Sequence, residues 1–357
     1  MKSRLVAKPF GLVLVVSLLV ASLLLAACGS AASVPVAQTA PEESSTPDAD
    51  SHDADHATPL SAVALAPGEK LRVVATTNIV ADVVSQVGGD KIELVALLAP
   101  GTDPHSYQPT PDDLRQLNDA HVIFINGLHL EEAMAPVLEN LDTPTPIISV
   151  NDGVATRVFS GEAHGEEGEE GEAADHAHEH EGADPHTWMN VANMLIWSEN
   201  VEHALSALDP AHSADYMAAA ERYGAALQQL DDEIRTQLAE IPAEQRKLVT
   251  DHDNLGYLAD AYGFTVLGAV IPSLSTMAAP SAQQMAALHD QIRTEGVKVI
   301  LVGNTVNPAA AQQLAQDSGA KVVPIFTDSL SGSDGPAATY VAMMRHNIAQ
   351  IVAAFKE

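Results

Sequence analysis

The sequence has a single cysteine, Cys28, and few basic residues. One cysteine cannot form an intrachain disulfide, and it rules out zinc or iron–sulfur sites built from several thiolates. Lys and Arg total 17 against 48 Asp and Glu, which gives a formal net charge of −31. Because phosphate binding requires a basic stripe, this balance argues against nucleic acid as a partner. Charge alone would also not hold the chain to an anionic membrane.

The rest of the composition is that of a folded protein with many potential metal ligands. Hydrophobic residues make up 46% of the 357 residues, which is enough for packed cores and excludes global disorder. At ~150 residues per domain, the length suggests about two globular units. The 15 histidines beside so many carboxylates leave metal binding through nitrogen and oxygen open.

Residues 1–27 have the pattern of a secretory signal, in which a basic start precedes the uncharged run Phe10–Ala27. The run is close to the minimum length for a membrane span, so an uncleaved anchor is the alternative. The sequence LAACG around Cys28 resembles a bacterial lipoprotein processing site. That resemblance implies cleavage before Cys28 and acylation of its sulfur. The protein would then be extracytoplasmic and lipid-anchored to the bacterial cell membrane.

Two further segments have compositions typical of unfolded chain. Residues 28–68 are rich in Ala, Ser, Pro and Asp without a periodic apolar pattern, which predicts a disordered stalk. Residues 161–182 hold nine acids and no Lys or Arg, which predicts a disordered acidic loop on the surface. Its histidines could gather metal, or the loop could be a merely solvated insertion. They are His164, His176, His178 and His180.

From Leu71 onward, β-rich runs alternate with helical patterns, which predicts parallel sheets covered on both faces by helices. The predicted strands are Leu71–Thr76, Ile92–Leu98, Val122–Asn126, Pro146–Ser149, Lys247–Thr250, Thr265–Val270, Val297–Gly303 and Lys321–Phe326. The predicted helices include one that begins at Pro111 after the N-cap Thr110, two near Asn193–Leu208 and Ala211–Ala239, and a last one over Pro336–Phe355. This order favours two α/β lobes joined by a long helix.

Polar side chains that could bind a ligand follow three of the predicted strands. His105, His252 and Asp328 lie beyond strand ends, where open α/β sheets bind their ligands. His186 lies in a loop, but both it and His105 are preceded by Asp-Pro. Proline restricts the backbone before the imidazole, and the aspartate could accept a hydrogen bond from the second ring nitrogen. A surface histidine, or a turn residue for Asp328, is the alternative interpretation of each.

The other histidines of the folded part have no such placement, and we interpret them as structural or solvent-facing. They are His121, His129, His203, His212, His289 and His346. Tyr340, Met343 and Met344 are spaced as a core face of the last helix. Trp188, two residues after His186, is expected to pack the loop rather than contact a substrate.

Four motifs, in order along the chain, resemble those of one family. They are PGTDPHSYQPTPDDL around His105, DPHTWMN around His186, TDHDNLGYLADAYGF around His252, and IFTDSL with YVAMMRHNI near the C-terminus. The family is the zinc/manganese substrate-binding lipoproteins of ABC importers, some of which were first named adhesins. The resemblance runs from about Leu71 to the C-terminus, outside the acidic loop. It implies two α/β lobes, each a mainly parallel sheet with flanking helices, joined by a long rigid helix with the metal site between them.

Carried over to this sequence, the family's metal ligands would be His105 and His186 from the first lobe and His252 and Asp328 from the second. We expect an N-terminal lobe over 69–190, a helical region with the linker helix over 191–241, and a C-terminal lobe over 242–357. The resemblance also implies a permease and its ATPase as partners, and we expect a monomer. One departure is Asn190-Val191, where the family commonly has an acidic residue followed by proline.

The proposed ligand set also predicts the metal. Three imidazoles and one carboxylate suit Zn²⁺ in a near-tetrahedral site, whereas Mn²⁺ prefers more oxygen ligands. Manganese-type relatives tend to carry Glu at the position of His252, so the resemblance favours zinc as well. We therefore expect a protein that is not an enzyme, captures Zn²⁺ and delivers it to an ABC importer. A Mn²⁺-binding protein is the alternative within this class; a zinc hydrolase, for which the sequence has no H-E-x-x-H motif, or an adhesin would be of another class.

Overall fold

The first sheet has four parallel strands in the order β2-β1-β3-β4. The computed structural model describes residues 60–158 and 182–356. The strands are β1 (Leu71–Ala75), β2 (Ile92–Ala96), β3 (Val122–Ile125) and β4 (Ile147–Ser149). The helices between them are α1 (Asn78–Gly88), α2 (Pro111–Asp119) and the short α3 (Ala135–Leu138). Parallel pairing follows from these connections, because each crossover returns the chain to the same end of the sheet.

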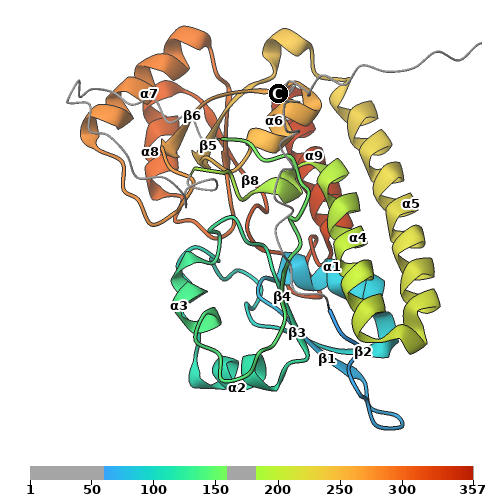
Figure 1. The fold of residues 1–357 in the computed structure, drawn as a ribbon. Helices are drawn as coiled ribbons and strands as arrows, with labels where there is room; N and C mark the ends of the chain where they lie inside the picture. Colours follow the sequence, from blue (N-terminus) through green and yellow to red (C-terminus); the bar gives the residue numbers. More distant parts are fainter. Residues whose placement is uncertain (1–59, 159–181, 357) are drawn as a thin grey trace, which may run out of the picture. The chain divides into compact units, whose positions relative to one another are not determined.

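The second sheet repeats this arrangement in the order β6-β5-β7-β8, again with parallel strands (Figure 1). Its strands are β5 (Lys247–His252), β6 (Thr265–Ile271), β7 (Val299–Val302) and β8 (Lys321–Pro324). The helices between them are α6 (Gly256–Tyr262), α7 (Ala282–Glu295) and α8 (Ala309–Ser318). The fold class predicted from the alternating pattern is confirmed. Strand β5 is longer than predicted, so His252 is its last residue rather than part of the following loop.

Between the two sheets the chain forms α4 (Val191–Leu208) and α5 (Ser213–Leu238), and it ends with α9 (Tyr340–Lys356). The 26 residues of α5 make it about 39 Å long at 1.5 Å per residue. Helix α5 packs against α4, α1 and α9, so elements far apart in sequence share one apolar core (Figure 1). Tyr340, Met343 and Met344 of α9 are fully buried, which confirms the predicted core face.

Two helix starts show how local chemistry fixes these elements. Thr110 caps α2 by accepting from the Asp113 N–H while the Asp113 carboxylate accepts from the Thr110 N–H, and Pro111 occupies the first turn. The predicted cap of this helix is confirmed. Helix α9 begins at Tyr340, four residues later than predicted, and the backbone N–H of Tyr340 donates to Asp82 of α1 at 2.8 Å.

The structure also revises one predicted boundary. We predicted a stalk up to residue 68, but Leu60, Val63 and Leu65 pack against the core, and the Val63 N–H donates to the Leu208 carbonyl at 2.8 Å. The attachment is explained by the apolar surface that Leu60, Val63 and Leu65 bury against the core. The predicted signal, Cys28 and the remaining stalk lie outside the described residues. In the described part of the chain, no helix is long and apolar enough to cross a membrane.

The predicted acidic loop, with His164, His176, His178 and His180, also lies outside the described residues, apart from Gly182 at its end. The residues that flank it are paired, since Val158 and Ala183 form an antiparallel bridge. The chain therefore leaves and re-enters the described fold at one place.

Candidate metal site

Four buried side chains from distant parts of the sequence converge at one point. They are His105, His186, His252 and Asp328, and one ligand atom of each lies within 4.8 Å of those of the others. His105 lies between β2 and α2, and His186 lies just before a 3₁₀ turn that leads into α4. His252 ends β5, and Asp328 follows β8. These are the four residues that the sequence singled out, and the structure brings all of them together.

The spacing within this cluster is that of ligands around one small cation. His105 Nε2 and His186 Nε2 are 3.3 Å apart. Two ligands of a tetrahedral zinc, each about 2.0–2.1 Å from the metal, would be separated by about 3.4 Å. His186 Nε2 lies 3.8 Å from Asp328 Oδ1, and His252 Nε2 lies 3.8 Å from Asp328 Oδ2. The geometry therefore fits a single ion held by three imidazoles and a carboxylate.

Two atoms of the cluster are buried without a hydrogen-bond partner among the described residues: His252 Nε2 and Asp328 Oδ1. A buried polar atom left in this state costs about 1–3 kcal/mol. Buried polar groups are otherwise almost always paired, so an unpaired acceptor beside an unpaired imidazole nitrogen needs an explanation. A cation between them would be bound by both atoms.

His186 is held in place by its neighbours in the loop and by two asparagines. Its Nδ1 lies 2.8 Å from Asp184 Oδ1, which also accepts the His186 backbone N–H at 3.0 Å. Asn126, just after β3, donates to the Pro185 carbonyl at 3.2 Å. Asn151, just after β4, accepts a hydrogen bond from the hydroxyl of Thr187. The ends of β3 and β4 thus fix the backbone on both sides of His186, and Asp184 directs Nε2 toward the cluster.

His252 is oriented by the residue directly before it. Its Nδ1 lies 3.1 Å from Asp251 Oδ1, and its backbone N–H donates to the same oxygen at 2.7 Å. The other oxygen, Asp251 Oδ2, accepts the Gly303 N–H from the end of β7 at 2.7 Å. A Cβ at position 303 would lie 2.1 Å from Thr327 Oγ1, so only glycine permits this approach. Asp251 was not predicted as a site residue, although its position beside His252 is a signal that could have been used.

Asp328 is anchored through one of its two oxygens. Asp328 Oδ2 accepts hydrogen bonds from Thr305 Oγ1 at 3.0 Å and from Thr327 Oγ1 at 2.8 Å. The Thr327 carbonyl in turn accepts from Trp188 Nε1 at 2.8 Å. Trp188 also packs against the ring of His186, at 5.3 Å between ring centroids. The tryptophan therefore packs the loop, as predicted, and it also joins the segments that carry His186 and Asp328.

The electrostatics of the cluster differ from one imidazole to the next. Burial, together with the neighbouring His186, lowers the pKa of His105 to about 3. Burial also acts to lower the pKa of His252, but Asp328 and Asp251 outweigh it and raise that pKa to about 9. Burial acts to raise the pKa of Asp328, and the three histidines outweigh it, so this pKa is lowered. An ionised Asp328 thus faces a protonated His252 until a cation replaces that proton.

One contact that the sequence left open differs between the two tripeptides. Asp184 contacts the ring of His186, whereas the contacts of Asp103 are to other groups. Asp103 instead accepts from the His105 backbone N–H at 3.0 Å and from the hydroxyls of Ser106 at 3.0 Å and Thr276 at 2.7 Å. The tripeptide fixes which backbone N–H each aspartate accepts, but it does not fix the direction of the imidazole.

The remaining histidines lie away from this cluster, which is the one group of three or more potential metal ligands found in residues 60–158 and 182–356. His121 Nδ1 accepts the Arg72 N–H at 3.0 Å, and His212 Nδ1 lies 2.7 Å from Asp209. His203 has a side chain that is 76% exposed. These positions agree with structural or solvent-facing roles.

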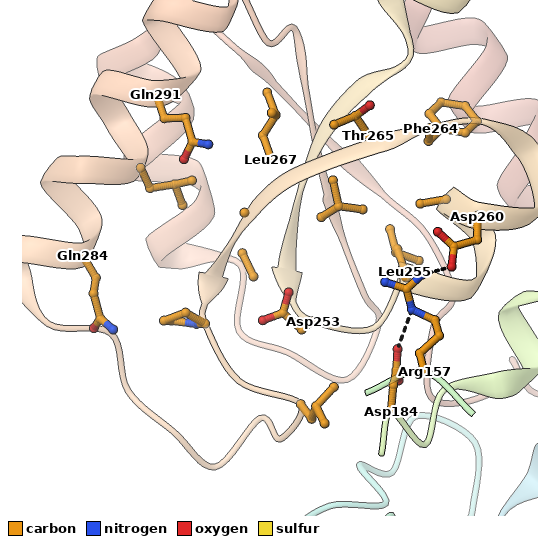
Figure 2. A pocket seen from close by; sticks show the side chains of 18 of the residues that line it. Arg157, Asp184, Asp253, Leu255, Asp260, Phe264, Thr265, Leu267, Gln284 and Gln291 are labelled. Atoms are coloured by element: carbon orange, nitrogen blue, oxygen red, sulfur yellow. Dashed lines mark hydrogen bonds and ion pairs between the residues drawn. The ribbon is translucent and has the colours of Figure 1, made fainter. Parts of the chain in front are cut away.

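Figure 2 shows a cavity of about 640 Å³ whose lining includes Asp184 but none of the four cluster residues. It is bounded by α6, β6 and α7, and by Arg157 and Val158 before the acidic loop. Arg157 lies between Asp260 of α6 and Asp184, with 3.9 Å between its Nε and Asp184 Oδ2 (Figure 2). Asp184 faces the cavity on one side and His186 on the other, so it is the contact between the two features.

Comparisons with known proteins place the chain in a family of metal-binding proteins. The family described as zinc-uptake complex component A, periplasmic (ZnuA), matches residues 73–354. The manganese ABC transporter substrate-binding lipoprotein PsaA of Streptococcus mitis is 31% identical over 293 residues, which cover 80% of this chain and 89% of the relative. The iron ABC transporter substrate-binding lipoprotein MtsA of Streptococcus pyogenes is 30% identical over 293 residues, with the same coverage.

Two solved structures extend the similarity to the fold. The periplasmic zinc binding protein TroA of Treponema pallidum has a TM-score of 0.70 at 29% identity, covering 80% of this chain and 99% of that one. The Mn-bound periplasmic metal binding protein of Candidatus Liberibacter asiaticus has a TM-score of 0.68 at 30% identity, covering 80% and 100%. A hydrolase is therefore no longer a candidate. The chain belongs to the ZnuA family of periplasmic metal-binding proteins, the substrate-binding components of ABC importers.

Proposed function

We propose that this chain captures Zn²⁺ with His105, His186, His252 and Asp328 and delivers it to the permease and ATPase of an ABC importer. The observation that supports this most directly is the pair of buried atoms without partners, His252 Nε2 and Asp328 Oδ1, which face a cluster of imidazoles. A cation bound by these atoms would satisfy the carboxylate oxygen and several imidazole nitrogens together. Capture needs no covalent chemistry.

The donor set supports zinc over manganese. Three of the four ligands are nitrogen atoms, and zinc binds nitrogen and oxygen in four-coordinate sites, whereas manganese prefers oxygen-rich, higher-coordinate sites. Manganese is the second candidate, because PsaA is named as a manganese protein and one similar structure is described as Mn-bound. The two proposals differ in one measurable quantity, the ratio of the two affinities.

The capture step joins segments from both sheets around the ion. Asn78, the first residue of α1, donates to Ser329 Oγ at 2.8 Å, and Thr276 donates to Asp103 at 2.7 Å. With the hydrogen bond from Trp188 to the Thr327 carbonyl, these contacts hold the two halves of the ligand set against each other. Release at the permease would separate the halves, because neither pair of ligands alone completes a four-coordinate site.

The proposed location rests on the N-terminal sequence. Cys28 would carry the lipid after signal cleavage, and residues between it and Leu60 would tether the folded part to the outer side of the bacterial cell membrane. The names of PsaA and MtsA, both lipoproteins, support this reading. We propose a monomer, since all four ligands come from one chain.

The test is metal titration of His105→Ala, His252→Ala and the double variant, by calorimetry with a chelator competitor. We expect one tight zinc site in the unmodified protein. Each single variant should lose more than the roughly 10- to 100-fold that is typical of residues which only orient a ligand. His203→Ala, at an exposed histidine, is the matched control and should bind normally. Unchanged tight binding in the double variant would contradict the proposed site.

The competing metal is tested in the same assay. Under the zinc proposal the unmodified chain prefers Zn²⁺ to Mn²⁺, and His252→Glu, which exchanges a nitrogen ligand for oxygen, narrows that preference. Tighter binding of Mn²⁺ than of Zn²⁺ by the unmodified protein would favour the second candidate.

Deletion of residues 161–182 should preserve the tight site, because none of the four proposed ligands comes from that segment.

A further inference from the structure

The two oxygens of Asp328 have different surroundings. Asp328 Oδ2 accepts hydrogen bonds from the hydroxyls of Thr305 at 3.0 Å and Thr327 at 2.8 Å. Asp328 Oδ1 is buried and has no hydrogen-bond partner among the described residues. Within one carboxylate, therefore, Oδ2 accepts two hydrogen bonds from the protein, whereas Oδ1 accepts none from the described residues and can bind a cargo ion.

This asymmetry limits how many oxygens Asp328 can offer. An ionised carboxylate has about four lone-pair sites, two on each oxygen. The two hydroxyls occupy both sites on Oδ2, whereas both sites on Oδ1 remain open. Oδ1 lies 3.8 Å from His186 Nε2, on the side where the two closest imidazole nitrogens meet, and Oδ2 lies 3.8 Å from His252 Nε2. The two oxygens therefore differ in the hydrogen bonds that they accept.

We propose that Thr305 and Thr327 act as positioning residues that make Asp328 a one-oxygen ligand, and that they thereby favour four-coordinate zinc over manganese. This inference rests on the proposed function and specifies how its metal preference arises. Zinc is satisfied by three nitrogens and one oxygen. Manganese gains more from a second carboxylate oxygen, because it prefers oxygen donors and a higher coordination number.

The two threonines are themselves held in place. Thr327 is fully buried; its N–H donates to Asn304 Oδ1 at 3.3 Å and its carbonyl accepts from Trp188. Gly303 lies so close to the Thr327 hydroxyl that a side chain there would displace it. Thr305 lies two residues further on, after the end of β7, and is half-buried. The loop after β7 thus brings a hydroxyl to Asp328 from a strand that contributes no ligand.

The variant that tests this is Thr305→Val, which removes one hydroxyl while keeping the shape of the side chain. It opens a lone-pair site on Oδ2, so the ratio of the Mn²⁺ to the Zn²⁺ association constant should rise roughly 10-fold, at the lower end of effects seen for residues that contact metal ligands. Thr305→Ser restores a hydroxyl and should return the ratio to normal. Thr236→Val, on the exposed face of α5, is the matched control and should leave it unchanged.

X-ray absorption at the zinc edge gives a second readout that a purely structural role would not change. In the unmodified protein we expect four ligands on zinc, of which one is a carboxylate oxygen. In Thr305→Val we expect the second oxygen of Asp328 to approach the zinc as well, at a longer distance than the first. Thr305→Ala must act in the same direction and covers the case in which valine does not fit. An unchanged metal ratio in both variants, or two Asp328 oxygens on zinc in the unmodified protein, would overturn this inference alone. Absence of tight zinc binding in the unmodified protein would overturn the proposed function and this inference with it.

Discussion

Asp103–His105 and Asp184–His186 are the same tripeptide in two loops, yet the two aspartates have different contacts. Asp184 is buried, lies 2.8 Å from the His186 ring nitrogen and is approached by Arg157. Asp103 is half-buried and accepts from Thr276, which follows β6 of the other sheet. One aspartate therefore orients the ring of a proposed ligand, and the other joins two segments around the proposed site. Identical local sequence sets the backbone of each loop, but the tertiary neighbours decide what the carboxylate does.

The same contrast separates His105 from His252. His252 is supported by Asp251 and faces Asp328, which together raise its pKa to about 9, whereas burial lowers the pKa of His105 to about 3. In the absence of metal at neutral pH, His252 is protonated and His105 is neutral. The second sheet thus supplies a charge-balanced pair, His252 and Asp328, while His105 of the first sheet is a neutral imidazole.

The different roles of the two aspartates are tested most directly by the variants Asp184→Asn and Asp103→Asn. Both changes preserve shape and remove a charge. Asp184→Asn should lower zinc affinity roughly 10- to 100-fold, because a ring-orienting carboxylate makes the imidazole a stronger donor. Asp103→Asn should stay below that range, because its contacts are to a backbone N–H and two hydroxyls. Affinities come from chelator competition, and equal losses in the two variants would contradict the assignment of different roles.

The different protonation of His252 and His105 predicts how zinc affinity and the stability of the metal-free protein depend on pH. Zinc must displace the proton of His252, so affinity should rise about 10-fold per pH unit between pH 7 and the His252 pKa of about 9. The contribution of His252 to the stability of the metal-free protein changes with pH in the opposite direction to zinc affinity. The raised pKa of His252 contributes stability that is fully present below about 6.5, its unfolded value, and is lost as pH rises through about 9. The lowered pKa of His105 costs stability only as pH falls below about 6.5 toward 3.

The measurements are zinc competition and denaturant unfolding of the metal-free protein from pH 6 to 9.5, each repeated with Asp251→Asn. That variant removes one of the contacts that raise the His252 pKa, so both pH dependences should move to lower pH. Zinc affinity that is flat between pH 7 and 9 would show that His252 is not protonated before metal binds.

Much of the fold and all four proposed ligands could be predicted from the sequence, because both depend on local patterns. Apolar runs bounded by turns predict strands, and His252 and Asp328 stand at or just beyond strand ends, where α/β sheets place their sites. Thr305 and Asn126 could not be found this way. Each contacts the site from a strand that carries no ligand, so its role depends on strand order, which local sequence does not encode. The contacts of Asp103 could not be predicted either, because the motif does not determine the direction of the His105 ring.

The smallest expected effect concerns Asn190, where the chain departs from the family pattern just after His186. Its side chain caps α4 by accepting the Ala192 N–H at 3.0 Å, so the asparagine performs the capping role that an acidic residue can also perform. Asn190→Ala should lower the free energy of unfolding by about 1 kcal/mol.

The zinc affinity of Asn190→Ala should stay close to normal, because Asp184, Asn126 and Asn151 hold the His186 segment without the cap. Asn190→Asp, which restores a capping oxygen, is the control in both denaturation and metal titration. A loss of affinity in Asn190→Ala as large as that in Asp184→Asn would mean that the helix cap, and not the ring contact alone, positions this ligand.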